Sequence, residues 1–121
     1  MAHDRLTRIC FIDYDREMAL VADRKSPETG EHEILGVGRL SKVRGTNEAE
    51  FALLVSDRFQ GQGLGTELLS RLLQVGRDED IDRIFGDILP ENREMQRICE
   101  RLGFRMVHNP RESLIRADTD L

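Results

Sequence analysis

The sequence predicts a single α+β (α/β) domain whose mixed, mostly antiparallel sheet of about six strands is flanked by helices. Its 121 residues fit one domain. Two segments, 64–75 and 92–102, repeat apolar residues at three- and four-residue steps, which is typical of amphipathic helices. Short apolar segments bounded by glycine, proline and polar residues surround these helices and predict strands.

The first half of the chain is expected to hold one helix end and three strands. In residues 5–12, RLTRICFI, the apolar side chains stand at helical spacing, which predicts the end of a helix. Strands are expected over 18–23, 34–40 and 48–55, separated by polar turns. The first two of these strands should form an antiparallel pair.

The second half is expected to alternate helices with strands. Gly76 and the charged residues after it should end the first helix, and Asn92 can cap the second. The strand, helix and strand between residues 48 and 89 should form a right-handed parallel crossover. The elements expected here are a helix over 64–75, a strand over 83–89, a helix after Asn92, and strands over 104–108 and 113–117.

Composition and charge exclude several classes of function. Eighteen basic and 23 acidic residues give a formal charge of −5, which argues against nucleic acid as a partner. No segment has the length and apolarity of a membrane span, and the N-terminus has no secretory signal pattern. Cys10 and Cys99 are read as free thiols, and the three histidines show no metal-ligand spacing. These features predict a cytoplasmic protein without a metal.

The sequence QGQGLG at 60–65 places three glycines between a predicted strand and the start of a helix. The first N–H groups of a helix have no internal partner, and the helix dipole adds positive potential there, so this turn predicts an anion site. The glycine spacing fits neither the dinucleotide fingerprint G-x-G-x-x-G nor the nucleotide loop that ends in Gly-Lys.

The QGQGLG turn and the segment NREMQRICERLGF at 92–104 together resemble two motifs of the GNAT N-acetyltransferase superfamily. The stretches RLTRICFIDYDREMALVA and EAEFALLVSDRFQGQGLG are similar to the GNAT domain of Pat-type bacterial protein lysine acetyltransferases. The resemblance implies a GNAT fold and a single GNAT domain over residues 1–121. The N-terminal strand and helix of that fold have no counterpart upstream, so a fragment of a longer protein is the alternative expectation.

The resemblance implies an N-acetyltransferase that uses acetyl-CoA as cosubstrate. The expected acceptor is a protein lysine amine, with an acyl-CoA synthetase as an example of a protein substrate. A small-molecule amine is the alternative acceptor, and a catalytically weak acyl-CoA-sensing domain is the alternative function. A homodimer is left open.

Two residues are candidates for proton transfer in that reaction. A lysine amine is mostly protonated near neutral pH, so attack on the thioester needs a general base. In the Pat-like group the glutamate of AEFA is the proposed base, which corresponds to Glu50; Glu48 is the alternative on the same face. Glu50 is preferred because it lies nearer the turn and is expected to have apolar neighbours. Many GNAT enzymes place an acidic tyrosine seven residues after the motif asparagine, where this chain has Cys99, which either acts as the acid or packs in the core.

The resemblance also assigns the residues that bind acetyl-CoA. The end of the third strand should hold the pantetheine arm through its backbone, the glycine turn should hold the diphosphate, and the motif asparagine should contact the cofactor. The residues are Leu53, Leu54, Val55, Gln60, Gly61, Gln62, Gly63, Leu64, Gly65, Thr66 and Asn92.

Overall fold

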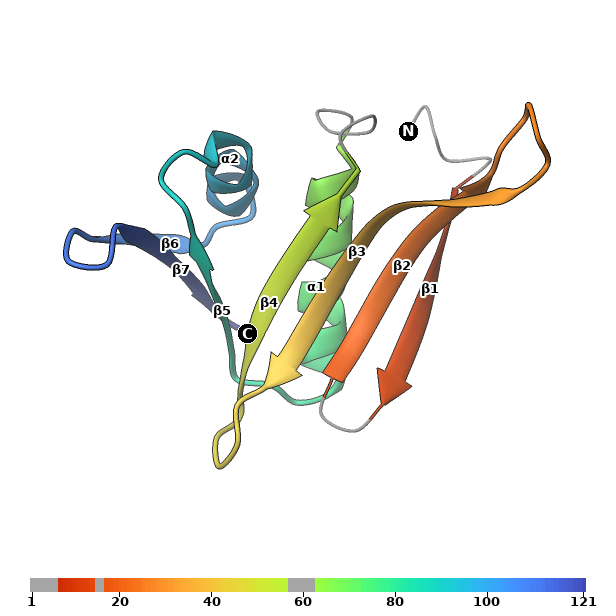
Figure 1. Cartoon of the computed structure of the whole chain (residues 1–121). Coiled ribbons are helices and arrows are strands. Elements are labelled where there is room, and N and C mark those ends of the chain that lie inside the picture. The colour runs from red at the N-terminus through yellow and green to blue at the C-terminus, as the bar shows by residue number, and fades with distance from the viewer. Residues whose placement is uncertain (1–6, 15–16, 57–62) are drawn as a thin grey trace.

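The computed structural model describes residues 7–14, 17–56 and 63–121. Its seven strands form one sheet in the order β1-β2-β3-β4-β5-β7-β6, and α1 packs on one face of the sheet (Figure 1). The predicted mixed, mostly antiparallel fold is confirmed, since only β4 and β5 pair in parallel. The elements are β1 (Thr7–Tyr14), β2 (Glu17–Lys25), β3 (His32–Lys42), β4 (Glu48–Val55), α1 (Leu64–Asp78), β5 (Arg83–Ile88), α2 (Arg93–Arg101), β6 (Arg105–Asn109) and β7 (Leu114–Asp120).

The first element is a strand, so the helix end predicted over residues 5–12 is wrong. β1 pairs antiparallel with β2 in unbroken register, from Thr7 opposite Arg24 to Tyr14 opposite Glu17. The segment TRICFIDY is rich in β-branched and aromatic residues, which favour a strand once a neighbour supplies the hydrogen bonds. This strand is the one that the sequence prediction of about six strands did not include.

The predicted cap of α2 is confirmed, whereas the predicted end of α1 is wrong. Asn92 caps α2 as predicted, because its Oδ1 accepts a hydrogen bond of 3.1 Å from the N–H of Met95. Gly76, in contrast, does not end α1, which continues to Asp78. A methyl group at Gly76 would lie 2.8 Å from Ile84 Cδ1 and 2.7 Å from Leu121 Cδ1, so this glycine allows close packing inside the helix.

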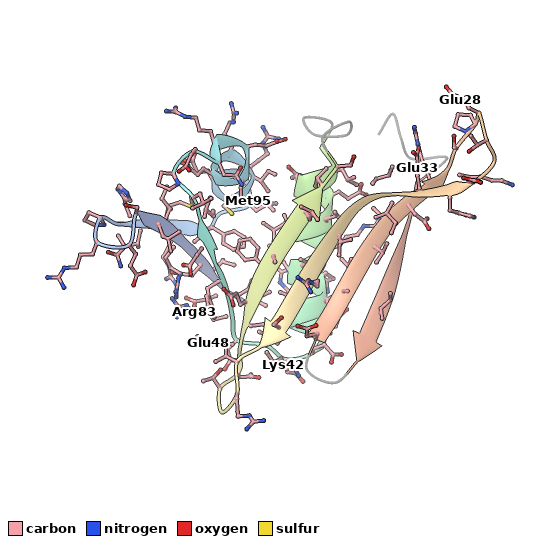
Figure 2. All side chains as sticks on the ribbon, viewed as in Figure 1. Glu28, Glu33, Lys42, Glu48, Arg83 and Met95 are labelled. Atoms are coloured by element: carbon pink, nitrogen blue, oxygen red, sulfur yellow. The ribbon has the colours of Figure 1, made fainter. Side chains whose placement is uncertain are left out.

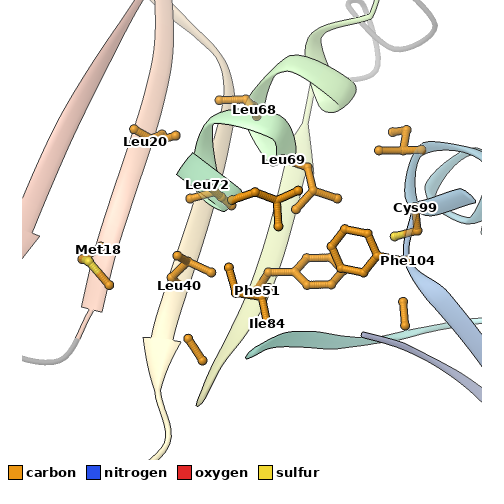
Figure 3. Packing of buried hydrophobic residues seen from close by; sticks show 14 of the residues in the cluster. Met18, Leu20, Leu40, Phe51, Leu68, Leu69, Leu72, Ile84, Cys99 and Phe104 are labelled. Atoms are coloured by element: carbon orange, nitrogen blue, oxygen red, sulfur yellow. The ribbon is translucent and has the colours of Figure 1, made fainter. Parts of the chain in front are cut away.

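The core lies between α1 and the sheet (Figure 3). The leucines of α1 that were predicted to be buried are between 0% and 6% exposed: Leu64, Leu68, Leu69, Leu72 and Leu73. Burying a leucine side chain contributes about 1.5–3 kcal/mol, so this stripe fixes α1 on the sheet. Neither described helix is long and apolar enough to cross a membrane.

β4 and β5 pair only at their beginnings and then separate. The predicted parallel pairing is confirmed, but it runs only from Glu48 opposite Arg83 to Glu50 opposite Phe85. Directly after it, the ring of Phe51 lies against Gly86, where a methyl group would be 2.5 Å from Phe51 Cε2. The same ring meets Phe104 edge-on, with centroids 5.5 Å apart. These aromatic rings therefore occupy the place where the two strands diverge.

A buried carboxylate joins the ends of β4, β5, β6 and β7. Asp118 is 5% exposed and lies 2.6 Å from Arg105 Nη2 and 3.1 Å from Arg83 Nη2. Arg83 also approaches Glu48 at 3.6 Å, and Figure 2 labels both residues at this end of the sheet. Burial alone would raise the pKa of Asp118, but the hydrogen bonds from Arg105 and Arg83 outweigh it and lower that pKa.

Candidate active site

Three clefts meet where β4, the start of α1 and α2 come together. The α1–α2 cleft, of about 530 Å³, is lined by Gly63, Gly65, Thr66, Glu94, Arg97, Ile98 and Arg101. The β4–α2 cleft, of about 160 Å³, is lined by Leu53, Leu54, Val55, Gly65, Asn92, Glu94, Met95 and Ile98. The β-face cleft, of about 460 Å³, is lined by Glu17, Arg39, Ser41, Glu50, Phe51, Ala52, Leu53, Asp87, Ile88, Leu89, Asn92 and Met95. Each cleft shares lining residues with the next, so the three adjoin one another in a row, which is called the channel below.

The start of α1 opens into the α1–α2 cleft. Gly63 is the N-cap, with φ 84°, and it has no side chain that could accept from the first N–H groups of the helix. These N–H groups and the helix dipole make the end of the cleft attractive to an anion. Close packing of the two helices requires a glycine at position 65, because a methyl group there would lie 2.8 Å from Ile98 Cδ1 of α2. Gly65 lets the two helices approach closely enough to form the cleft.

Of the residues predicted to bind the cofactor in the glycine turn, the structure describes 63–66. Thr66, a predicted cofactor-binding residue, lines the α1–α2 cleft. Leu64 is 2% exposed, so only its backbone N–H is placed to meet a ligand. The predictions for Gln60, Gly61 and Gln62 lie outside the described residues.

Two arginines of α2 were not among the predicted site residues. Arg97 and Arg101 stand one helical turn apart and line the α1–α2 cleft together with Glu94. Within the described part of the chain neither arginine has an ion-pair partner. Both therefore add positive charge beside the start of α1. Their spacing of four residues in the helix after Asn92 was the available signal in the sequence.

The edge of β4 that faces β5 borders the β4–α2 cleft. Since β4 leaves β5 after Glu50, the backbone groups of residues 51–54 on this side have no strand partner in β5, and this stretch is called the free edge of β4. Such an edge can pair with the amides of an extended ligand in the manner of an added strand. Leu53, Leu54 and Val55, which are predicted to hold the pantetheine arm, line this cleft. Met95 lies on the side of α2 that faces β4 (Figure 2).

Asn92 lies where the β4–α2 cleft and the β-face cleft meet. Its side-chain oxygen is used in capping α2, so its amide nitrogen is the group left to donate to a ligand. Both readings of this asparagine, as a helix cap and as a cofactor contact, therefore fit the same position.

Glu50 and Glu48, the two candidate bases, lie in different surroundings. Glu50 is exposed and lines the cleft, whereas Glu48 is paired with Arg83 in the ionic cluster around Asp118. The apolar neighbours expected to surround Glu50 lie on the opposite face, because alternate residues of a strand point to opposite sides. Glu50 instead has a polar setting, because Arg116 donates a hydrogen bond of 2.7 Å to Asp87 nearby. The pKa of Arg116 is raised by this bond first, then by the charge of Asp87 and then by the charge of Glu50.

Cys99 lies in the core, away from the clefts. Its side chain is 0% exposed, it is not among the residues that line the three clefts, and Figure 3 shows it beside Phe104. Burial raises the pKa of its thiol to about 12. This position does not support the prediction that Cys99 protonates a leaving thiolate, and it agrees with the alternative that Cys99 packs in the core.

The described residues include no group of three or more histidine, cysteine, aspartate or glutamate side chains that could hold a metal ion.

Comparisons with known proteins agree on one family. A family model for the acetyltransferase (GNAT) domain matches residues 1–105. A curated acetyltransferase of Pseudomonas aeruginosa is 31% identical over 108 residues, which cover 89% of this chain. The chain spans only 57% of the length of that relative.

Solved structures share the fold. The GNAT domain of S. lividans PAT superposes with a TM-score of 0.76 at 26% identity, covering 92% of this chain and 65% of that one. The structure of yncA from Salmonella typhimurium with its cofactor acetyl-CoA gives a TM-score of 0.76 at 22% identity, covering 87% and 65%. A cAMP-binding acyltransferase from Mycobacterium smegmatis gives 0.73 at 24%, covering 90% of this chain and 32% of that one.

Proposed function

The chain belongs to the GNAT acetyltransferase domain family, and from this premise we propose that it transfers an acetyl group from acetyl-CoA to the amine of a protein lysine. The observation that carries the proposal is the row of adjoining clefts from the start of α1, past the free edge of β4, to Glu50. The likeness to the GNAT domain of S. lividans PAT supports a protein acceptor. A single-domain organisation, a cytoplasmic location and an acyl-CoA synthetase as acceptor stay predictions.

Each part of the channel suits one part of acetyl-CoA. The open N–H groups at the start of α1, with Arg97 and Arg101 beside them, suit the negatively charged diphosphate and nucleotide phosphate. The free edge of β4 suits the two amides of the pantetheine arm. This orientation would bring the thioester toward the β-face cleft, where an acceptor amine can enter beside Glu50.

The acceptor nitrogen must lose two protons, and the departing thiolate must gain one. Glu50, directly or through a water molecule, takes the first proton from the acceptor ammonium, and the neutral nitrogen attacks the thioester carbon. A C–N bond forms, and negative charge develops on the carbonyl oxygen, which a backbone N–H of the free β4 edge is suited to stabilise. The C–S bond then breaks, and the nitrogen gives its second proton, directly or through water, to the departing CoA thiolate. Glu50 returns the first proton to solvent, so the balance closes without Cys99.

The experiment combines calorimetric binding of acetyl-CoA with thiol release in the presence of lysine-containing acceptors. Glu50→Gln should bind acetyl-CoA within about twofold of the wild type but lose about 10²–10⁴ in turnover, the usual range for a general base. Glu48→Gln is the matched control on the same strand face and should keep its turnover, since Glu48 is held by Arg83. Unchanged turnover in Glu50→Gln would remove Glu50 as the base. Tight binding without thiol release in the wild type would favour an acyl-CoA sensor instead.

A further inference from the structure

Arg39 is a cation in the β-face cleft that the proposed reaction does not use. It lies on β3, is exposed, and is flanked in register by Ala19 of β2 and Ala52 of β4. The two alanine side chains are short, so Arg39 has no bulky side chain directly opposite it on either adjacent strand. In the part of the chain that the structure describes, Arg39 forms no ion pair with a carboxylate.

Asp87 and Glu17, two carboxylates that line the same cleft as Arg39, each have a hydrogen-bond partner. Asp87 is bound by Arg116 at 2.7 Å, and Glu17 accepts a hydrogen bond of 3.2 Å from Ser41 Oγ. Glu50 stands diagonally across the strand pair from Arg39, since Ser41 is opposite Glu50 and Arg39 is opposite Ala52. Diagonal positions of this kind are about 7–8 Å apart. The cleft thus presents a negative group and a positive group one register step apart on the same face of the sheet.

We propose that Arg39 binds a carboxylate of the acceptor while Glu50 receives its amine, so the acceptor is a protein lysine with an acidic residue beside it. This inference rests on the proposed function. A guanidinium fork matches a carboxylate with two parallel hydrogen bonds, which fixes both position and orientation. A lysine without a nearby carboxylate would bring its positively charged ammonium group close to Arg39 and offer no negative group to pair with the guanidinium. Repulsion between the two cations would weaken the binding of such an acceptor.

The strand positions of Arg39 and Glu50 are about 7–8 Å apart, and both side chains are flexible. A lysine side chain with an adjacent aspartate or glutamate side chain can span that distance. A free α-amino acid, whose amine nitrogen and carboxyl carbon are about 2.5 Å apart, can also contact both groups. The protein acceptor therefore follows from the proposed function, and the test includes a free amino acid.

The test compares two pairs of acceptors at saturating acetyl-CoA, with kcat/KM from CoA release. The first pair is a blocked Gly-Asp-Lys-Gly peptide and its Gly-Asn-Lys-Gly counterpart; the second is L-leucine and L-leucine amide. The wild type should prefer the Asp peptide over the Asn peptide by about tenfold, the effect of one charge-assisted hydrogen-bonded contact. Arg39→Gln should reduce this ratio to about one, and Arg39→Lys should keep part of it.

Arg44→Gln is the matched control, because Arg44 is an exposed arginine in the β3–β4 turn and does not line the cleft. It should leave the peptide ratio unchanged. A ratio that stays the same in Arg39→Gln, or a wild type without preference between the peptides, would overturn the inference, as would a preference for leucine over both peptides. Binding of acetyl-CoA without turnover of any of the four acceptors would also count against it. Failure to bind acetyl-CoA at all would instead contradict the proposed function.

Discussion

Gly86→Ala tests how the strand divergence that borders the site is built. A methyl group at this position would lie 2.5 Å from Cε2, 2.7 Å from Cζ and 2.8 Å from Cδ2 of Phe51. Carbon atoms in good contact are about 3.5–4.0 Å apart, so the methyl group overlaps the ring by about 1 Å. The ring has little freedom to withdraw, because its centroid is 5.5 Å from that of Phe104 in an edge-on contact.

The expected loss of stability follows from two opposing effects. Overpacking a well-filled core costs about 1–3 kcal/mol. Replacing a strand glycine by alanine returns about 0.5–1 kcal/mol through the lower entropy of the unfolded chain. We therefore expect Gly86→Ala to lower the free energy of unfolding by about 1–2 kcal/mol, measured by urea denaturation with fluorescence-independent detection such as circular dichroism.

A double-mutant cycle with Phe51→Leu identifies the ring as the cause. Leucine has no counterpart of Cε2 and Cζ, the two ring atoms nearest the new methyl group, so the double variant should be more stable than the sum of the single losses by about 1 kcal/mol. Additive losses within about 0.5 kcal/mol, or an unchanged unfolding free energy in Gly86→Ala, would refute this account of the divergence.

Three further predictions concern the α1–α2 cleft and the ionic cluster. Gly63→Val places a branched residue at a φ of 84°, and the control Gly45→Val does the same at 78°, so both variants should lose about 1–2 kcal/mol of stability. In calorimetry only Gly63→Val should lose acetyl-CoA binding. The double variant Arg97→Gln/Arg101→Gln should weaken binding of CoA about tenfold or more at low salt, and the difference from wild type should shrink as salt is raised. Asp118→Asn should lose about 2 kcal/mol near neutral pH. Because the folded pKa of Asp118 is lowered, its contribution is present above the unfolded value of about 4 and is lost as pH falls through the folded pKa, so the two unfolding free energies should converge in acid.

Features set by local sequence could be predicted from the sequence. The leucine stripe of α1 depends only on helical spacing, and the cap by Asn92 depends on a side chain and an N–H three residues later. The bounds of β4, Glu48–Val55, also follow from a short apolar segment between polar turns. For the same reason the position of the glycine turn, between β4 and α1, was predictable.

Features that depend on which segments meet in space could not be predicted. RLTRICFI has the residues of a strand and the spacing of a helix, and pairing with β2 decides between them. Gly76 looks like a helix end until Ile84 and Leu121 are seen to fill the space beside it. Glu50 was assigned apolar neighbours that the strand alternation places on the other face. Arg39 was overlooked because an arginine in a strand gives no local sign that it lines a cleft.

The structure of the chain bound to CoA, solved by crystallography, is the most direct test of the central claim. The account predicts diphosphate oxygens about 3 Å from backbone nitrogens at the start of α1, between Gly63 and Thr66, with the pantetheine arm along the free edge of β4. A diphosphate bound elsewhere, or a pantetheine arm that does not follow β4 toward Glu50, would contradict it.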